Sequence, residues 1–126
     1  MDLAPGLAAD VKLTVGDEDT AIAFGSGTVP VLATPRVIAL CEEATVKAIE
    51  DELPQGQTTV GMRVQIDHLA PSAVGHTVIA EATLEKVEGR RLTFTVNAKD
   101  ERGLIAAGKV TRVLVDTARF LDKAND

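Results

Sequence analysis

Three polar residues, Thr34, Glu42 and His68, have the types and the spacing that acyl-transfer chemistry uses. The first two belong to one long amphipathic segment, and the histidine lies on the strand-like segment that follows. A glutamate can act as a nucleophile or a general base, and an imidazole can transfer protons. Because ionisable groups on apolar surfaces cost free energy unless a function uses them, the set favours an acyl-transfer site over a purely structural domain.

The helical segment places Glu42 at the edge of an apolar stripe. At 100° per residue, Glu43 falls nearly opposite this stripe, so Glu42 is the unusual glutamate of the pair. The centre of the stripe consists of Val37, Cys41, Ala44, Thr45 and Ala48. Two interpretations of Glu42 stay open: a rim carboxylate that reaches solvent, or a base or nucleophile whose pKa is tuned by partial burial.

His68 repeats this pattern on a strand. Alternate residues share one strand face, so the imidazole should point with the apolar side chains towards the helix. Those side chains are Val60, Met62, Val64 and Ile66. A core histidine with satisfied hydrogen bonds is the alternative to a catalytic one.

Thr34 stands at the expected start of the helix, immediately before Pro35. The simplest interpretation is an N-cap, whose hydroxyl satisfies the first helical N–H groups. A helix N-terminus can also stabilise a developing oxyanion. Eight helical residues separate Thr34 from Glu42 by about 12 Å along the axis. Both can therefore touch one carbonyl only if Thr34 lies in the loop and folds back.

Arg112 is a further charge that we expect to point inward, because it alternates with Val110 and Leu114 on the last strand-like segment. It could pair with a carboxylate, bind a phosphate, or form a salt bridge at the sheet edge. Cys41 lies in the middle of the apolar stripe and is expected to be an inert core thiol. One cysteine and two histidines give no metal-ligand spacing, so no metal is expected.

The elements that must position these residues are one long helix and several antiparallel strands. Two short apolar runs around the turn GDED predict a hairpin over residues 11–24, and the helix should continue to about Leu53. Strands are predicted at 58–70, 76–87, 91–99 and 104–115. Their short connections predict an antiparallel meander. The predicted fold is α+β, with a curved antiparallel sheet wrapped around one long central helix.

Length and charge limit the classes of function. The 126 residues fit a single domain, 1–126, and the net charge of −6 argues against a nucleic-acid partner. The N-terminal segment lacks the basic and apolar regions of a signal peptide. No apolar run reaches the roughly 18 residues of a membrane span. We therefore expect a cytoplasmic protein that acts on neither nucleic acid nor membrane.

At these residues the chain resembles the hot-dog-fold thioesterases, in particular the fluoroacetyl-CoA thioesterase-like family. In that family a Thr opens the central helix, a Glu follows eight residues later, and a His follows 26 residues after the Glu. Thr34, Glu42 and His68 fall at those spacings. Gly61, Arg112 and the segment EGRRLTFTVNAKD are similar as well.

The resemblance implies an acyl-CoA thioesterase that works as a homodimer, with a tetramer left open, and needs no cofactor because CoA is part of the substrate. Thr34, Glu42 and His68 would be catalytic at the subunit interface. Gly61 would help Thr34 to position the carbonyl, and Arg112 would support the site or the pantetheine. No Phe stands between Phe24 and the helix, so we expect a small or medium acyl group other than fluoroacetyl. A non-catalytic acyl-CoA-binding module and a hot-dog enoyl-CoA hydratase are the alternatives.

Overall fold

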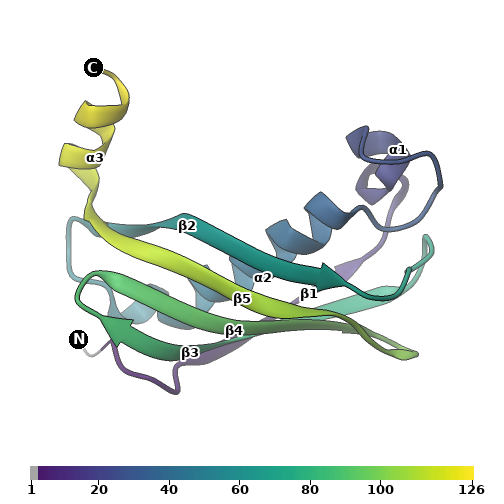
Figure 1. The fold of residues 1–126 in the computed structure, drawn as a ribbon, viewed down its shortest axis with the longest axis horizontal. Coiled ribbons are helices and arrows are strands. Elements are labelled where there is room, and N and C mark those ends of the chain that lie inside the picture. Colours follow the sequence, from purple (N-terminus) through teal and green to yellow (C-terminus); the bar gives the residue numbers. More distant parts are fainter. Residues whose placement is uncertain (1–2) are drawn as a thin grey trace.

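One five-stranded antiparallel sheet and one long helix make up most of the computed structural model, which describes residues 3–126 (Figure 1). The strand order is β1-β3-β4-β5-β2. The strands are β1 (Ala8–Thr14), β2 (Gln57–His68), β3 (Thr77–Glu88), β4 (Arg91–Asp100) and β5 (Gly103–Asp116). The helices are α1 (Ala21–Phe24), α2 (Thr34–Ile49) and α3 (Thr117–Ala124), with 3-10 turns at Asp17–Asp19 and Glu50–Glu52.

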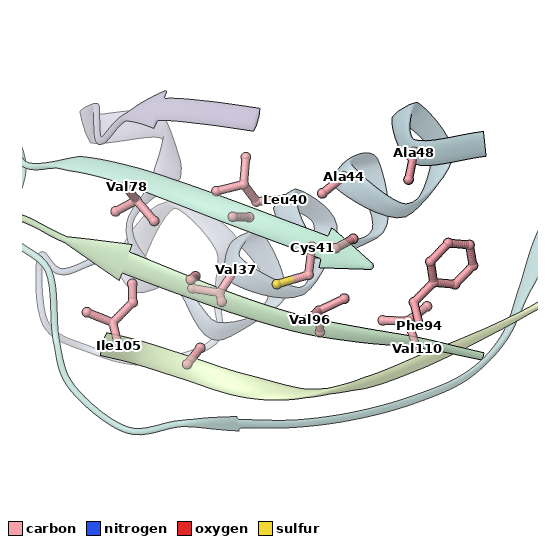
Figure 2. Packing of buried hydrophobic residues seen from close by; sticks show 14 of the residues in the cluster. Val37, Leu40, Cys41, Ala44, Ala48, Val78, Phe94, Val96, Ile105 and Val110 are labelled. Atoms are coloured by element: carbon pink, nitrogen blue, oxygen red, sulfur yellow. The ribbon is translucent and has the colours of Figure 1, made fainter. Parts of the chain in front are cut away.

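The helix α2 lies against all five strands, which confirms the predicted α+β arrangement. Its buried side chains face the alternate residues of β3, β4 and β5 (Figure 2). The strand residues in this core include Val78, Ala80, Ala82, Leu84, Leu92, Phe94, Val96, Ala98, Ile105 and Val110. The two alternating faces predicted for β3 and β4 are therefore confirmed. Alanines on both sides of the contact let the helix approach the sheet closely, because they occupy little volume.

The prediction of an uninterrupted meander is wrong at β2. Strands β3, β4 and β5 pair in sequence order, but β2 pairs with β5 at the far edge of the sheet. His68 lies opposite Ala106, and Gln57 lies opposite Asp116. The connection between β2 and β3, residues 69–76, therefore crosses the end of the sheet instead of forming a hairpin.

The predicted hairpin over residues 11–24 is also wrong. β1 pairs with β3, from Ala8 opposite Thr83 to Thr14 opposite Thr77. The second half of the expected hairpin forms α1, where the hydroxyl of Thr20 accepts a hydrogen bond from the N–H of Ala23. Gly25 ends this turn in the left-handed conformation, at φ 67°. A capping threonine and a terminating glycine thus outweigh the strand propensity of the short apolar run.

A β-bulge in β2 makes the predicted strand face wrong for two residues, Val60 and Met62. The pairing shifts between Gly61, opposite Arg112, and Arg63, opposite Thr111, so that Met62 is an extra residue. One extra residue reverses the alternation. Val64, Ile66 and His68 lie on the α2 side, as expected. Before the bulge, however, this side carries Thr59 and Gly61, because Val60 pairs with Val113 on the opposite face.

Candidate active site

Thr34 and His68 are in direct contact. The Thr34 hydroxyl oxygen lies 2.7 Å from Nδ1 of His68, joining the first residue of α2 to the last residue of β2. The N-cap of α2 is Ala33, so the interpretation of Thr34 as the N-cap is wrong. The Thr34 hydroxyl is therefore available to the imidazole, either as a donor to Nδ1 or as an acceptor from an Nδ1–H group.

The other ring nitrogen of His68, Nε2, lacks a well-formed hydrogen bond among the described residues. This nitrogen is buried. Burial lowers the pKa of His68 below its usual value of 6.5, and the backbone of Ala70 acts more weakly in the opposite direction, so the imidazole favours its neutral form. A neutral imidazole held by a hydroxyl at Nδ1 can accept a proton at Nε2 and, once protonated, deliver it again.

An open pocket of about 310 Å³ lies beside Thr34 and His68. Most of its wall is apolar and comes from the loop between α1 and α2 and from the segment after β2. These wall residues include Val29, Val31, Leu32, Leu69, Ala70 and Pro71. A small apolar group bound here would lie next to the imidazole.

Glu42 belongs to a second cluster, with Gly61 and Arg112. Its Oε2 lies 3.6 Å from Nη1 of Arg112, and its side chain is half-buried at the edge of the core. A Cβ atom on Gly61 would lie only 2.7 Å from the same Oε2. The glycine thus leaves room for the carboxylate against β2, and Glu42 lies at the edge of the apolar stripe as the helical periodicity predicts.

Arg112 is buried and fixed by Thr59 on the neighbouring strand. Its Nε donates to the Thr59 hydroxyl at 2.9 Å, and its Nη2 donates to the Thr59 carbonyl at 3.0 Å. Burial lowers the pKa of Arg112, and the charge of Glu42 acts in the opposite direction. Arg112 points inward and pairs with a carboxylate, which was one of the outcomes open from the sequence.

Cys41 is a buried free thiol next to this cluster in the sequence. Burial, with a smaller contribution from the charge of Glu42, raises its pKa to about 11. At neutral pH the thiol stays protonated, which fits the expected inert core residue.

The two clusters are separate within one protomer. Glu42 makes no hydrogen bond or ion pair with His68 in the part of the chain that the structure describes. Thr34 and Glu42 differ by eight residues on α2, or about 12 Å along the helix axis. Gly61 and His68 differ by seven residues on β2, or roughly 20 Å along the strand. Thr34 lies in the helix rather than in the loop, so it does not fold back towards Glu42.

Sequence reasoning missed a third polar group, formed by His76, Asp100 and Glu101. Nδ1 of His76 lies 3.5 Å from Oδ2 of Asp100, and the three residues offer ligand atoms within 4.8 Å of one another. Burial acts to raise the pKa of Asp100, but hydrogen bonds from Ser72 and Arg102 outweigh it and lower the pKa to about 2. The charged carboxylate of Asp100 is thus already stabilised by hydrogen-bond donors of the protein. No spacing signal could have found this group, because His76 precedes β3 whereas Asp100 and Glu101 stand at the end of β4 and in the turn after it, and only the fold brings them together.

Comparisons with known proteins agree on one family. The family model described as "FlK: Fluoroacetyl-CoA-specific thioesterase" matches residues 15–118. A fluoroacetyl-CoA thioesterase from Streptantibioticus cattleyicolor is 34% identical over 90 residues. This match covers 71% of the present chain and 65% of the relative, so the chain spans just under two thirds of that curated relative.

Solved structures show the same fold. The fluoroacetyl-CoA thioesterase FlK superposes with a TM-score of 0.93 at 27% identity, covering 99% of this chain and 97% of FlK. A thioesterase superfamily member from Thermus thermophilus superposes with a TM-score of 0.91 at 29% identity, covering 98% and 92%. A hot-dog-like protein from Thermanaerovibrio acidaminovorans gives a TM-score of 0.87 at 26% identity, covering 95% and 89%. The expected hot-dog fold is confirmed.

Proposed function

The chain belongs to the fluoroacetyl-CoA-specific thioesterase family, and we propose that it hydrolyses the thioester of an acyl-CoA to a free acid and CoA. The contact between Thr34 and His68, at the edge of an apolar pocket, is the observation that carries this proposal. It supplies a positioned proton-transfer group next to a space for an acyl chain. Variants of the related FlK have been solved with acetyl-CoA and with fluoroacetate and CoA.

In the proposed reaction, the Glu42 carboxylate attacks the thioester carbonyl or removes a proton from the attacking water. The C–S bond breaks, and His68 in its protonated form delivers a proton to the departing sulfur. The proton that water releases, directly or through Glu42, then restores His68, while Thr34 orients the imidazole and the carbonyl. If Glu42 is the nucleophile, an anhydride forms first and water then cleaves it. Single turnover in ¹⁸O-labelled water separates the two routes, because only the nucleophilic route can leave labelled oxygen in the carboxylate of Glu42.

A homodimer brings the two clusters together. β2 is an edge strand, and it exposes the apolar side chains of Met62 and Val64. An unpaired apolar edge favours pairing with a second copy of the chain. A two-fold axis near Val64, midway between Gly61 and His68, would bring His68 of each protomer beside the Gly61 end of its partner. Each site then combines Thr34 and His68 of one protomer with Glu42 of the other.

Arg112 acts in this proposal as a positioning residue. Its buried guanidinium, held by Thr59, keeps the Glu42 carboxylate against Gly61. Little of the guanidinium is exposed, so the substrate would meet Glu42 and the backbone of Gly61 rather than Arg112 itself.

The acyl group is small or of medium size. The pocket beside His68 holds about 310 Å³ and is walled by aliphatic side chains. No aromatic residue occurs between Phe24 and α2, so the loop over this pocket lacks a ring that could close on a single fluoromethyl group.

Release of free CoA from short, branched and aryl acyl-CoAs tests the proposal. A thioesterase releases thiol from saturated substrates, whereas an enoyl-CoA hydratase does not. Glu42→Gln should lower kcat by orders of magnitude while the protein remains folded and still binds CoA. A protein that binds these substrates tightly but cleaves none of them would be a binding module, and the proposal would be wrong.

A further inference from the structure

A second pocket, of about 390 Å³, lies at the opposite end of β2 from His68. It is formed by α3, the end of β5 and the turn between β3 and β4. Its lining residues are Arg90, Arg119, Lys123, Phe120, Val115 and Asp116. Three cations and one aromatic ring thus surround a single open space.

These three cations are not neutralised by the protein. Arg90, Arg119 and Lys123 form no ion pair within residues 3–126. Of the other ten cations, six pair with carboxylates, namely Arg36, Lys86, Lys99, Arg102, Lys109 and Arg112. Asp116 is the one acid in the pocket lining, and its carboxylate accepts a hydrogen bond from the N–H of Arg119. The lining therefore keeps a net positive charge in a chain whose net charge is −6.

The geometry of α3 directs these groups into one site. Arg119 and Lys123 are four residues apart, so they lie on one helix face, and Phe120 is partly exposed beside them. Guanidinium and ammonium groups bind phosphate oxygens, and an exposed ring can stack on a nucleobase.

The pocket lies near the β2 edge that the proposed dimer would pair. α3 begins where the N–H of Thr117 donates to the carbonyl of Gly56, immediately before β2. Arg112 and Asp116 are four residues apart on β5, which is roughly 13 Å. Figure 1 shows α3 and α1 beyond the two ends of β2, both past the free edge of that strand. A partner paired along β2 would therefore bring its own His68 end towards this α3.

The geometry points to a binding site for the phosphorylated adenosine end of CoA in this pocket, an inference that rests on the proposed function. Arg90, Arg119 and Lys123 contact its phosphates, and Phe120 stacks on its adenine. The pantetheine arm then runs along the β2 edge to the catalytic groups. Because this end of CoA does not react, the contacts lower KM without changing kcat.

The test uses adenosine 3′,5′-bisphosphate as the probe and calorimetry as the measurement. In Arg119→Gln/Lys123→Gln, we expect the Kd of this probe to rise roughly tenfold, because two charge-assisted contacts are lost. The control is Lys12→Gln/Lys99→Gln, which removes the same charge from the β1 side of the sheet and should bind the probe as the native protein does. Higher salt should weaken binding to the native protein.

Kinetics separate this inference from the proposed function. In the α3 double variant, KM for an acyl-CoA should rise by a similar factor at unchanged kcat, and turnover of the acyl-pantetheine, which lacks the nucleotide, should not change. Unaltered bisphosphate binding and unaltered KM would overturn the inference while leaving the thioesterase intact. A chain that cleaves no thioester but loses bisphosphate binding in the double variant would keep the site and refute the activity.

Discussion

The hydroxyl of Thr34 lies 2.7 Å from Nδ1 of His68, so the start of α2 and the end of β2 are joined by a single side-chain hydrogen bond. This bond fixes the imidazole in one orientation and leaves Nε2 directed away from the threonine. A proton-transfer group needs such a fixed geometry, because small displacements of a reacting group are costly.

Replacing Thr34 by Ala should lower kcat strongly and leave stability almost unchanged. The hydroxyl holds His68 but does not cap α2, so the loss of about 1 kcal/mol that accompanies removal of an N-cap should be absent. Thr34→Ser keeps the hydroxyl and should retain most of the activity. Turnover of an acyl-CoA and thermal unfolding measure the two effects. A large loss of stability in Thr34→Ala would show that the hydroxyl supports the fold instead.

Gly61→Ala should displace the Glu42 carboxylate. The added Cβ would lie 2.7 Å from Oε2, closer than real side-chain contacts allow. We expect kcat to fall at least tenfold, through loss of the catalytic geometry. A double-mutant cycle with Glu42→Gln provides the control, since Gly61→Ala should cost little further activity once the carboxylate is gone. Independent, additive losses would contradict the contact.

Thr59→Val should weaken the support of Glu42 indirectly, because Thr59 holds Arg112 and Arg112 pairs with Glu42. The substitution removes the hydroxyl that accepts from Nε of Arg112 and leaves a buried charged donor unpaired, which costs about 2 kcal/mol of stability. Because Glu42 then loses a rigid partner, the pH profile of kcat should shift along with kcat itself. Denaturant unfolding and a pH–rate series test this. Thr59→Ser, which keeps the hydroxyl, should behave like the native protein.

Val64→Asp should convert the proposed dimer into monomers. It places a charge in the middle of the exposed β2 edge, where two copies would bury it. Sedimentation should show half the mass, and turnover should disappear although the circular dichroism spectrum is retained. Ile79→Asp, at a similarly exposed apolar position on β3, is the comparison variant away from the edge. Full activity in a monomeric Val64→Asp protein would exclude a site shared between protomers.

The pKa of His68 should report the assembly directly. In the Val64→Asp monomer, burial should hold this pKa below 6.5. Stability of the monomer should then decrease as the pH falls through 6.5, because the unfolded chain binds the proton more readily. In the dimer, a facing carboxylate would raise the pKa, and Glu42→Gln should lower it again. NMR titration of the imidazole, with His76→Gln to assign the two signals, measures both. An identical pKa in all three proteins would argue against a facing Glu42.

The sequence predicts the regular parts of this fold well, because their patterns are long. The stripe of α2 and the alternation of β3 and β4 repeat over many residues, and packing against one another enforces them. The same helical and strand periodicities predict that Glu42 lies at the edge of the core and that His68 and Arg112 point inward. The pairing of Arg112 with Glu42, however, could not be predicted without the register between β5 and β2, which sets Arg112 opposite Gly61.

The errors arise where one residue decides the outcome. Thr20 and Gly25 turn an apolar run into a helical turn, and the bulge at Met62 reverses the faces before it. Such single-residue effects leave no periodic signal. The prediction that Thr34 caps α2 is wrong for a similar reason. Ala33 is the N-cap, and the threonine hydroxyl hydrogen-bonds to His68, 34 residues away.

The buried Cys41 has a practical consequence for anyone who assays this protein. Colorimetric reagents for free coenzyme A are aromatic disulfides that react with any accessible thiolate. With its only sulfhydryl enclosed and its pKa about 11, the native protein should contribute no background colour, and alkylating agents should leave it untouched. A slow rise in colour from the protein alone would accordingly report transient opening of the core.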